Sequence, residues 1–265
     1  MKWLLRYDLH EVQAEWVLPE LPFEPWLVQP LSKQRLLICH PRCSFSPKDQ
    51  KPNAAILDYE GKILTNLVLG DGILDIQVCD DIIWCAYFDE GIFGNRGWGE
   101  GSKSTPIGNT GLAAFDLTGK IIFKFQEPPH PDIDYEICDC YAMNVINNKE
   151  VWICPYTDFP LIKVGLDHKY QQWSTPPEIS GNHSIALSWN RALLTNDYEK
   201  KFTRLIEFNN QGYSKLIKEF QVVDKTGNAF PLTVGRGADL YFTDPKYEEV
   251  YRLSIYDLDP YLLSS

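Results

Sequence analysis

NAAILDYEGKILTNLVLGDGILDIQVCDDIIWCAYFDEGIFGNRGWG, residues 53–99, is the stretch that decides the fold. Two apolar runs flank a tight turn at Glu60 and Gly61, and two further apolar runs follow Gly70, Asp71 and Gly72. Short apolar runs that are separated by turn residues at intervals of about 8–12 residues are typical of all-β proteins. The stretch therefore predicts four consecutive strands and, after them, a glycine-rich loop.

The same unit recurs along the chain. A pair of strands, made of an apolar run, a short polar break and a strongly apolar run, can be traced five times. These pairs begin at Trp26, Ile73, Cys140, His183 and Phe230. A second kind of hairpin lies between the pairs, and its marker residues are Asp8, Asp58, Asp116, Asp167 and Asn209, with spacings of 50, 58, 51 and 42 residues. Four strands in about 40–50 residues make one blade of a β-propeller.

In this repeat, the chain resembles the β-propeller superfamily in its divergent Trp-Asp-repeat and lactonase-like forms. It is also similar to uncharacterised bacterial propeller proteins across the stretch Tyr-Phe-Asp-Glu-Gly that begins at Tyr87. The resemblance covers nearly the whole chain but rests on pattern, since no Gly-His…Trp-Asp repeat is present. It implies an all-β fold in which residues 1–265 form a single β-propeller domain.

Five blades are favoured and six are the alternative. The strand of the second hairpin occurs six times, so we expect the N-terminal and C-terminal strands to pair and close the ring. A β-sandwich or two small β-domains would also be all-β, but neither requires so regular a repeat.

The composition and the lack of an export or anchoring pattern favour the cytoplasm. The 265 residues, 44% of them hydrophobic, are enough to bury a large core. The N-terminal stretch has no signal-peptide pattern, and no run reaches the roughly 18 apolar residues of a transmembrane helix. Seven cysteines, an odd number that lie mostly within predicted strands, fit a reducing compartment.

The formal net charge is −11 at pH 7. Phosphate recognition depends on Lys and Arg, so this charge disfavours nucleic acids and anionic membranes as ligands. It would attract a basic protein and speed the encounter with it. The alternative interpretation is that the charge only keeps a monomeric protein soluble.

The glycine-rich stretch after Tyr87 is the most distinctive candidate surface. It extends for about 20 residues, and connections of that length in compact domains are usually functional. Aromatic and arginine side chains flanked by acids are typical of protein-binding hot spots. The candidate partner-binding residues here are Phe88, Asp89, Glu90, Phe93, Arg96 and Trp98. Alternatively, Phe93 and Trp98 fold back to plug the channel or cover a blade face.

Residues 126–136 form a second candidate surface. Prolines stiffen this stretch into an extended loop. Its carboxylates Asp132, Asp134 and Glu136 would join those of the first loop in one acidic face.

The lactonase-like resemblance implies a divalent cation, such as Ca²⁺, at the mouth of the central channel. Carboxylate and amide oxygens suit such an ion. The candidate ligands at the starts of the predicted inner strands are Glu24, Asp75, Asp139, Asn182 and Asn228. Turn and cap residues that bond to their own backbone are the alternative explanation.

Two hypotheses about function follow. The first is a non-catalytic protein-interaction propeller, without cofactor or catalytic residues, whose acidic and aromatic face binds a basic protein. A concrete form of it is an immunity protein that neutralises a nuclease toxin. The alternative is a metal-dependent enzyme of the lactonase or hydrolase type, in which the cation polarises a carbonyl or activates water. No GxSxG elbow or phosphate-binding glycine motif supports another chemistry.

Overall fold

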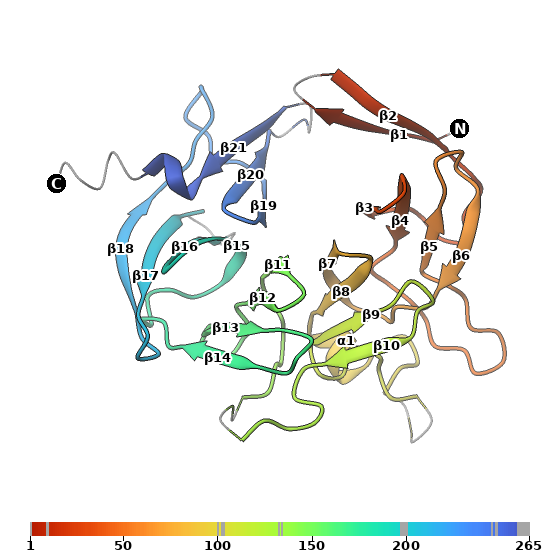
Figure 1. The fold of residues 1–265 in the computed structure, drawn as a ribbon, viewed down its shortest axis with the longest axis horizontal. Helices are drawn as coiled ribbons and strands as arrows, with labels where there is room; N and C mark the ends of the chain where they lie inside the picture. Colours follow the sequence, from red (N-terminus) through yellow and green to blue (C-terminus); the bar gives the residue numbers. More distant parts are fainter. Residues whose placement is uncertain are drawn as a thin grey trace. The chain divides into compact units, whose positions relative to one another are not determined.

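A computed structural model describes residues 2–8, 11–99, 101, 104–131, 133, 135–196, 201–244, 246 and 249–258, with the backbone alone up to residue 15. The fold is an all-β, five-bladed β-propeller. The chain divides into two compact units, Met1–Phe125 and Gln126–Ser265, which are described separately below (Figure 1). Among the described residues, no helix is long and apolar enough to cross a membrane.

The first unit holds a hairpin and two four-stranded antiparallel sheets. The hairpin consists of β1 (Lys2–Asp8) and β2 (Glu11–Leu18). The strands of the first sheet are β3 (Leu27–Leu31), β4 (Arg35–Cys39), β5 (Ala54–Leu57) and β6 (Ile63–Leu67). The strands of the second are β7 (Ile73–Cys79), β8 (Ile82–Tyr87), β9 (Leu112–Phe115) and β10 (Ile121–Lys124), with helix α1 (Asp89–Phe93) between β8 and β9.

The second unit holds three antiparallel sheets. The first consists of β11 (Met143–Asn147), β12 (Glu150–Ile153), β13 (Leu161–Val164) and β14 (Tyr170–Trp173). The next consists of β15 (Asn182–Ser188), β16 (Arg191–Asn196), β17 (Thr203–Phe208) and β18 (Ser214–Phe220). The last consists of β19 (Leu232–Arg236), β20 (Asp239–Thr243) and β21 (Val250–Ser254), and a 3₁₀ helix (Ile255–Leu258) follows it.

The predicted repeat is confirmed, and so is the blade count of five. The five strand pairs read from the sequence are β3–β4, β7–β8, β11–β12, β15–β16 and β19–β20. Within the units, β1 pairs with β2 and β21 pairs with β20. Each terminal strand therefore takes backbone hydrogen bonds from its neighbour in sequence. Closure of the ring by the terminal strands stays a prediction. The expectation of one domain over residues 1–265 stays a prediction.

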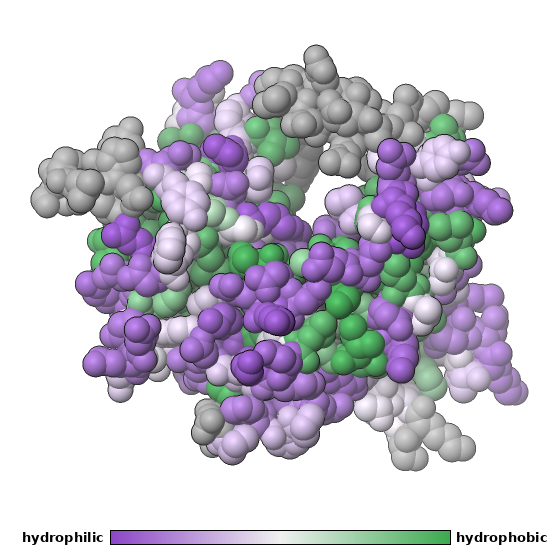
Figure 2. Space-filling view, viewed as in Figure 1, coloured by the Kyte–Doolittle hydropathy of each residue, from purple (hydrophilic) through white to green (hydrophobic). Residues whose placement is uncertain are grey.

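Burial explains why the repeat could be read from the sequence. The middle strands β5, β8 and β9 are buried almost throughout and consist of continuous apolar runs. The outer strand β6 alternates between partly buried and exposed residues, as a strand does when one of its faces meets water. The core thus lies around the middle strands. The face of the molecule in Figure 2 is mostly hydrophilic, with separate hydrophobic patches.

Antiparallel order brings the long connections of the first unit together at one end of its sheets. Residues 40–53, 68–72, 88–99 and 104–111 meet there and are called the loop cluster below. Phe45 N–H donates to the carbonyl of Arg96 at 2.9 Å, and Ile73 N–H donates to that of Pro41 at 3.0 Å. At the other end, the short β3–β4 and β7–β8 turns are joined by the ion pair of Arg35 with Asp81 at 2.7 Å.

Candidate functional site

The stretch after β8 begins with a short helix where the sequence indicated only a loop. In α1, Gly91 and Ile92 are buried, whereas Phe93 has 67% of its surface exposed. Asp89, at the first position of the helix, is exposed as well. The helix therefore covers the loop cluster with one face and presents an aromatic ring and a carboxylate on the other.

Two glycines allow α1 to approach the β6–β7 connection. A Cβ atom on Gly91 would lie 2.4 Å from the carbonyl oxygen of Asp71, and one on Gly72 would lie 2.3 Å from the nitrogen of Gly91. Gly72 also has a φ of +70°, which favours glycine. Gly72 is thus a point of close backbone contact that fixes the helix.

A buried carboxylate joins two of the three loops. Asp71 accepts hydrogen bonds from Arg42 Nε and a second guanidinium nitrogen, both at 2.9 Å, and from Cys43 N–H at 2.7 Å. Its side chain is 1% exposed, and that of Arg42 is 22% exposed. The bidentate geometry fixes the Arg42 plane, and these hydrogen bonds hold the pKa of Arg42 above its usual value.

Arg42 also connects Asp71 to the helix. Its guanidinium forms an ion pair with Glu90 and lies 5.4 Å from the centre of the Phe88 ring, within reach of a cation–π interaction. Phe88 and Glu90, two predicted partner-binding residues, are therefore partly buried and engaged within the loop cluster. No sequence motif singled out Arg42 or its pairing with Asp71, which lies 29 residues away in the chain.

Trp98 lies inside the loop cluster. It is 7% exposed, its indole N–H donates to the carbonyl of Cys43 at 2.6 Å, and its ring centre lies 4.9 Å from that of Phe45. This is the folded-back position that the second interpretation of the sequence predicted for it. Arg96, by contrast, is exposed on a tight turn with a φ of +51°. Asp89, Phe93 and Arg96 are the candidates of this loop that remain exposed.

The second candidate surface is described only in part. Asp132 and Asp134 lie outside the described residues. Glu136 is exposed in the second unit, in the segment before β11. The residues Ile133 and Ile137, on either side of it in the chain, are buried.

The candidate cation ligands of the first unit have local roles. Asp75 accepts hydrogen bonds from Ile76 N–H and from the Gln77 amide, both at 2.8 Å. Glu24 is exposed in the segment before β3.

The same is true of the candidates in the second unit. Asp139 forms an isolated bridge with Tyr156, and Asn182 is buried with its amide 3.6 Å from the sulfur of Cys154. Asn228 donates to Thr226 Oγ1 at 2.8 Å within an exposed turn. Over the described part of the chain, no three His, Cys, Asp or Glu side chains are grouped so that they could hold a metal ion.

The fold and the loop cluster define the class of protein. It is a small β-propeller in which the long connections of the first unit pack together at one end of its two four-stranded sheets. The family model called YxzG family matches residues 112–251, just over half of the chain. The chain therefore belongs to the YxzG family. No curated protein matches it.

Solved structures share the propeller fold. A catalytically inactive virginiamycin B lyase from Staphylococcus aureus with quinupristin has a TM-score of 0.50 and 14% identity, over 88% of this chain and 67% of that one. A complex of KlAtg21 with the coiled coil of AgAtg16 also has a TM-score of 0.50, with 10% identity over 94% and 68%. AztD from Citrobacter koseri has a TM-score of 0.43 and 13% identity over 92% and 59%. At these identities, the likeness concerns the fold alone.

Proposed function

We propose that the protein is a non-catalytic interaction propeller that binds a basic protein through the exposed residues Asp89, Phe93 and Arg96, here called the α1 surface. The observation that carries this proposal is Phe93, a phenylalanine with 67% of its surface exposed on a helix whose other face is buried. An aromatic ring on a fixed element is a typical binding anchor, since little conformational entropy is lost when it is covered.

The surroundings of Phe93 support this role. The Gly72–Gly91 contact and the Arg42–Asp71–Glu90 interactions hold the backbone of α1 in place. Asp89 supplies a carboxylate next to the ring, and the whole chain carries a net charge of −11. Such charge speeds encounter with a basic partner more than it strengthens the final complex.

The partner that we propose is a nuclease toxin, with this protein as its immunity protein. A nuclease active site binds phosphate and is therefore cationic, so an acidic surface with an aromatic anchor has the chemistry needed to cover it. The proposal places the protein in the cytoplasm, where it acts as a monomer until the toxin is bound.

The test starts with the tagged protein expressed in its native host, and with the identification of a basic co-purifying protein. The association rate and Kd of that pair are then measured over a series of salt concentrations. Phe93→Ala should weaken binding about 30-fold, as expected for an anchor worth about 2 kcal/mol. Asp89→Lys should slow association and reduce its salt dependence.

Matched control variants come from the opposite end of the same unit, in the β5–β6 turn. Tyr59, with 61% of its surface exposed, and the neighbouring Glu60 repeat the pairing of an aromatic with an acid. Tyr59→Ala and Glu60→Lys should leave binding unchanged. Absence of a basic partner, binding that is insensitive to salt, or equal effects of Phe93→Ala and Tyr59→Ala would each contradict the proposal.

A further inference from the structure

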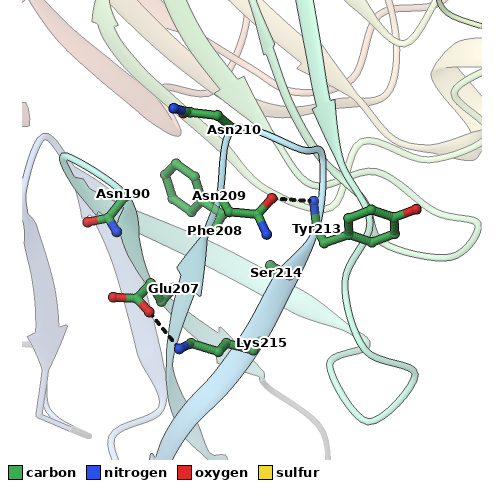
Figure 3. A pocket seen from close by; sticks show the side chains of 8 residues that line it. All are labelled: Asn190, Glu207, Phe208, Asn209, Asn210, Tyr213, Ser214 and Lys215. Carbon is green, nitrogen blue, oxygen red and sulfur yellow. Dashed lines mark hydrogen bonds and ion pairs between the residues drawn. The ribbon is translucent and has the colours of Figure 1, made fainter.

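A groove of about 480 Å³ lies in the second unit, between the β15–β16 turn and the β17–β18 hairpin. Figure 3 shows Asn190 and Glu207 on one side and Tyr213, Ser214 and Lys215 on the other. Its full lining consists of Asn190, Glu207, Phe208, Asn209, Asn210, Tyr213, Ser214 and Lys215. The volume lies within the range of about 300–1,000 Å³ that is usual for small-molecule sites.

One carboxylate and one ammonium line the groove and form an ion pair, and the guanidinium of Arg191 adjoins them. Lys215 Nζ lies 2.8 Å from Glu207 Oε2 (Figure 3), and Arg191 Nε lies 3.7 Å from the other carboxylate oxygen. The ion pair with Lys215 and a hydrogen bond from Asn190 are among the interactions that keep the pKa of Glu207 below its usual value, and Lys215 contributes the most. An anionic ligand would therefore have to displace Glu207 from Lys215, and a cationic ligand would have to displace Lys215.

The remaining lining groups are amides and hydroxyls. Asn209 Oδ1 accepts hydrogen bonds from Gln211 N–H at 2.8 Å and Tyr213 N–H at 3.2 Å, so this amide is fixed with its NH₂ group as the remaining donor. Asn210 is exposed beside it. Phe208 is 6% exposed and packs on Trp152 and Trp173, so it offers little apolar surface to a ligand.

An exposed indole stands next to the groove in the chain. Trp189 immediately precedes the lining residue Asn190 and has 93% of its surface exposed. Its φ of +48° is a left-handed conformation that asparagine and glycine adopt at such turns and that is unfavourable for a bulky side chain. The same left-handed conformation occurs at Lys33 and Asp80 in the corresponding β3–β4 and β7–β8 turns, so it belongs to the hairpin. The indole of Trp189 is not among the lining residues, but its exposed ring is available to a ligand that extends beyond the groove.

We infer that this groove binds a neutral saccharide. Sugar hydroxyls both donate and accept hydrogen bonds, as amide groups and the Glu207–Lys215 pair do, and the C–H face of a sugar ring can cover an exposed indole or the ring of Tyr213. Lys215 is already paired with Glu207, and this carboxylate disfavours phosphates. The buried position of Phe208 disfavours the apolar side chain of a peptide. The site lies apart from the α1 surface in the chain and does not depend on the proposed function.

The full chain is titrated with glucose, galactose, N-acetylglucosamine, maltose and cellobiose, and binding is followed by tryptophan fluorescence and by indole N–H signals in NMR spectra. At least one sugar should bind saturably with a Kd of about 1 mM or lower. Trp189→Ala and Asn210→Ala should each weaken that binding at least about tenfold without changing the thermal unfolding midpoint, since both side chains are exposed.

Trp26→Ala is the matched control because Trp26, in the first unit, is also exposed, at 70%. It should leave sugar binding unchanged. The inference is overturned if none of the five sugars perturbs an indole signal, or if Trp189→Ala binds as the parent protein does. It is also overturned if the Trp189 signal shifts only with protein concentration or with an added peptide, because the surface would then be a protein interface.

Discussion

At the scale of single residues, the loop cluster depends on one carboxylate. Asp71 accepts three hydrogen bonds from the segment that holds Arg42 and Cys43, and its side chain is almost fully buried. Arg42 in turn reaches Glu90 on α1. Removal of the Asp71 carboxylate would leave a partly buried guanidinium and a backbone N–H without this acceptor, which is the costly way to break an ion pair.

We therefore expect Asp71→Ala to lower the free energy of unfolding by about 3 kcal/mol. The measurement is urea denaturation of the purified variant. The matched control is Asp81→Ala, because the Asp81 carboxylate is 27% exposed, against 1% for Asp71. It pairs with Arg35 and accepts hydrogen bonds from Ser32 at the surface. That variant should lose about 1 kcal/mol or less. Equal losses would show that Asp71 has no special role.

Two aromatic residues of the same stretch show where sequence reasoning stops. Phe93 and Trp98 lie five positions apart in a glycine-rich segment, and either could have been the anchor. Trp98 is buried because Cys43 and Phe45, about 50 residues earlier in the chain, supply an acceptor and a ring for it. No local pattern contains that information.

At the scale of elements, one asparagine connects the inner strands of the second unit. Asn144 on β11 is fully buried, and its NH₂ group donates to the carbonyls of Ile185 at 2.7 Å and Gly237 at 2.9 Å. Its oxygen accepts from Gly237 N–H at 3.0 Å. Nearby, a Cβ on Gly235 would lie 1.9 Å from the Ile185 carbonyl oxygen, so β19 approaches β15 as closely as only glycine allows.

Asn144→Ala should lower the free energy of unfolding by about 2–3 kcal/mol, because it leaves buried backbone groups without partners. Asn147→Ala on the same strand is the control. Asn147 is exposed, and its oxygen accepts one hydrogen bond, from Lys149 N–H, so the loss should be about 0.5 kcal/mol. Thermal and urea unfolding of both variants would measure the difference, and a similar loss in the two would contradict this role for Asn144.

At the scale of the whole molecule, the acidic charge couples stability to pH. In Asp116 and Asp224, hydrogen bonds from the hydroxyls of Thr118 and Thr226 are the main cause of a pKa below the usual value. Lysine partners have the same effect on the pKa of Asp167 and Glu207. A lowered folded-state pKa stabilises the protein above the unfolded-state pKa of about 4, and this contribution is lost as pH falls through the folded-state value.

The unfolding temperature should therefore decrease between about pH 5 and pH 2, with proton uptake on unfolding. Scanning calorimetry at several pH values measures this decrease. A double variant, Thr118→Ala with Thr226→Ala, should show a smaller decrease, because it removes the main cause of the lowered pKa of Asp116 and of Asp224. An unfolding temperature that is constant or rises on acidification would contradict the expectation.

The sequence by itself determined the class of fold and favoured five blades over six. Buried middle strands must be apolar, outer strands alternate, and turns need particular residues, so a repeated blade leaves a repeated pattern. It also indicated the segment that carries α1, through its length and its glycines.

Only the tertiary structure decided which side chains face solvent and which surfaces form. Trp98 is buried and Phe93 is exposed because of contacts with a distant loop, and Asp71 meets Arg42 across 29 residues. The groove of the second unit, for which we propose a saccharide ligand, forms where the β15–β16 turn meets the β17–β18 hairpin, near Asn190 and Asn209. The physical reason is the same for the aromatic residues, the ion pair and the groove. A local pattern shows which residues of a strand are buried, whereas a site depends on contacts between segments that are distant in the chain.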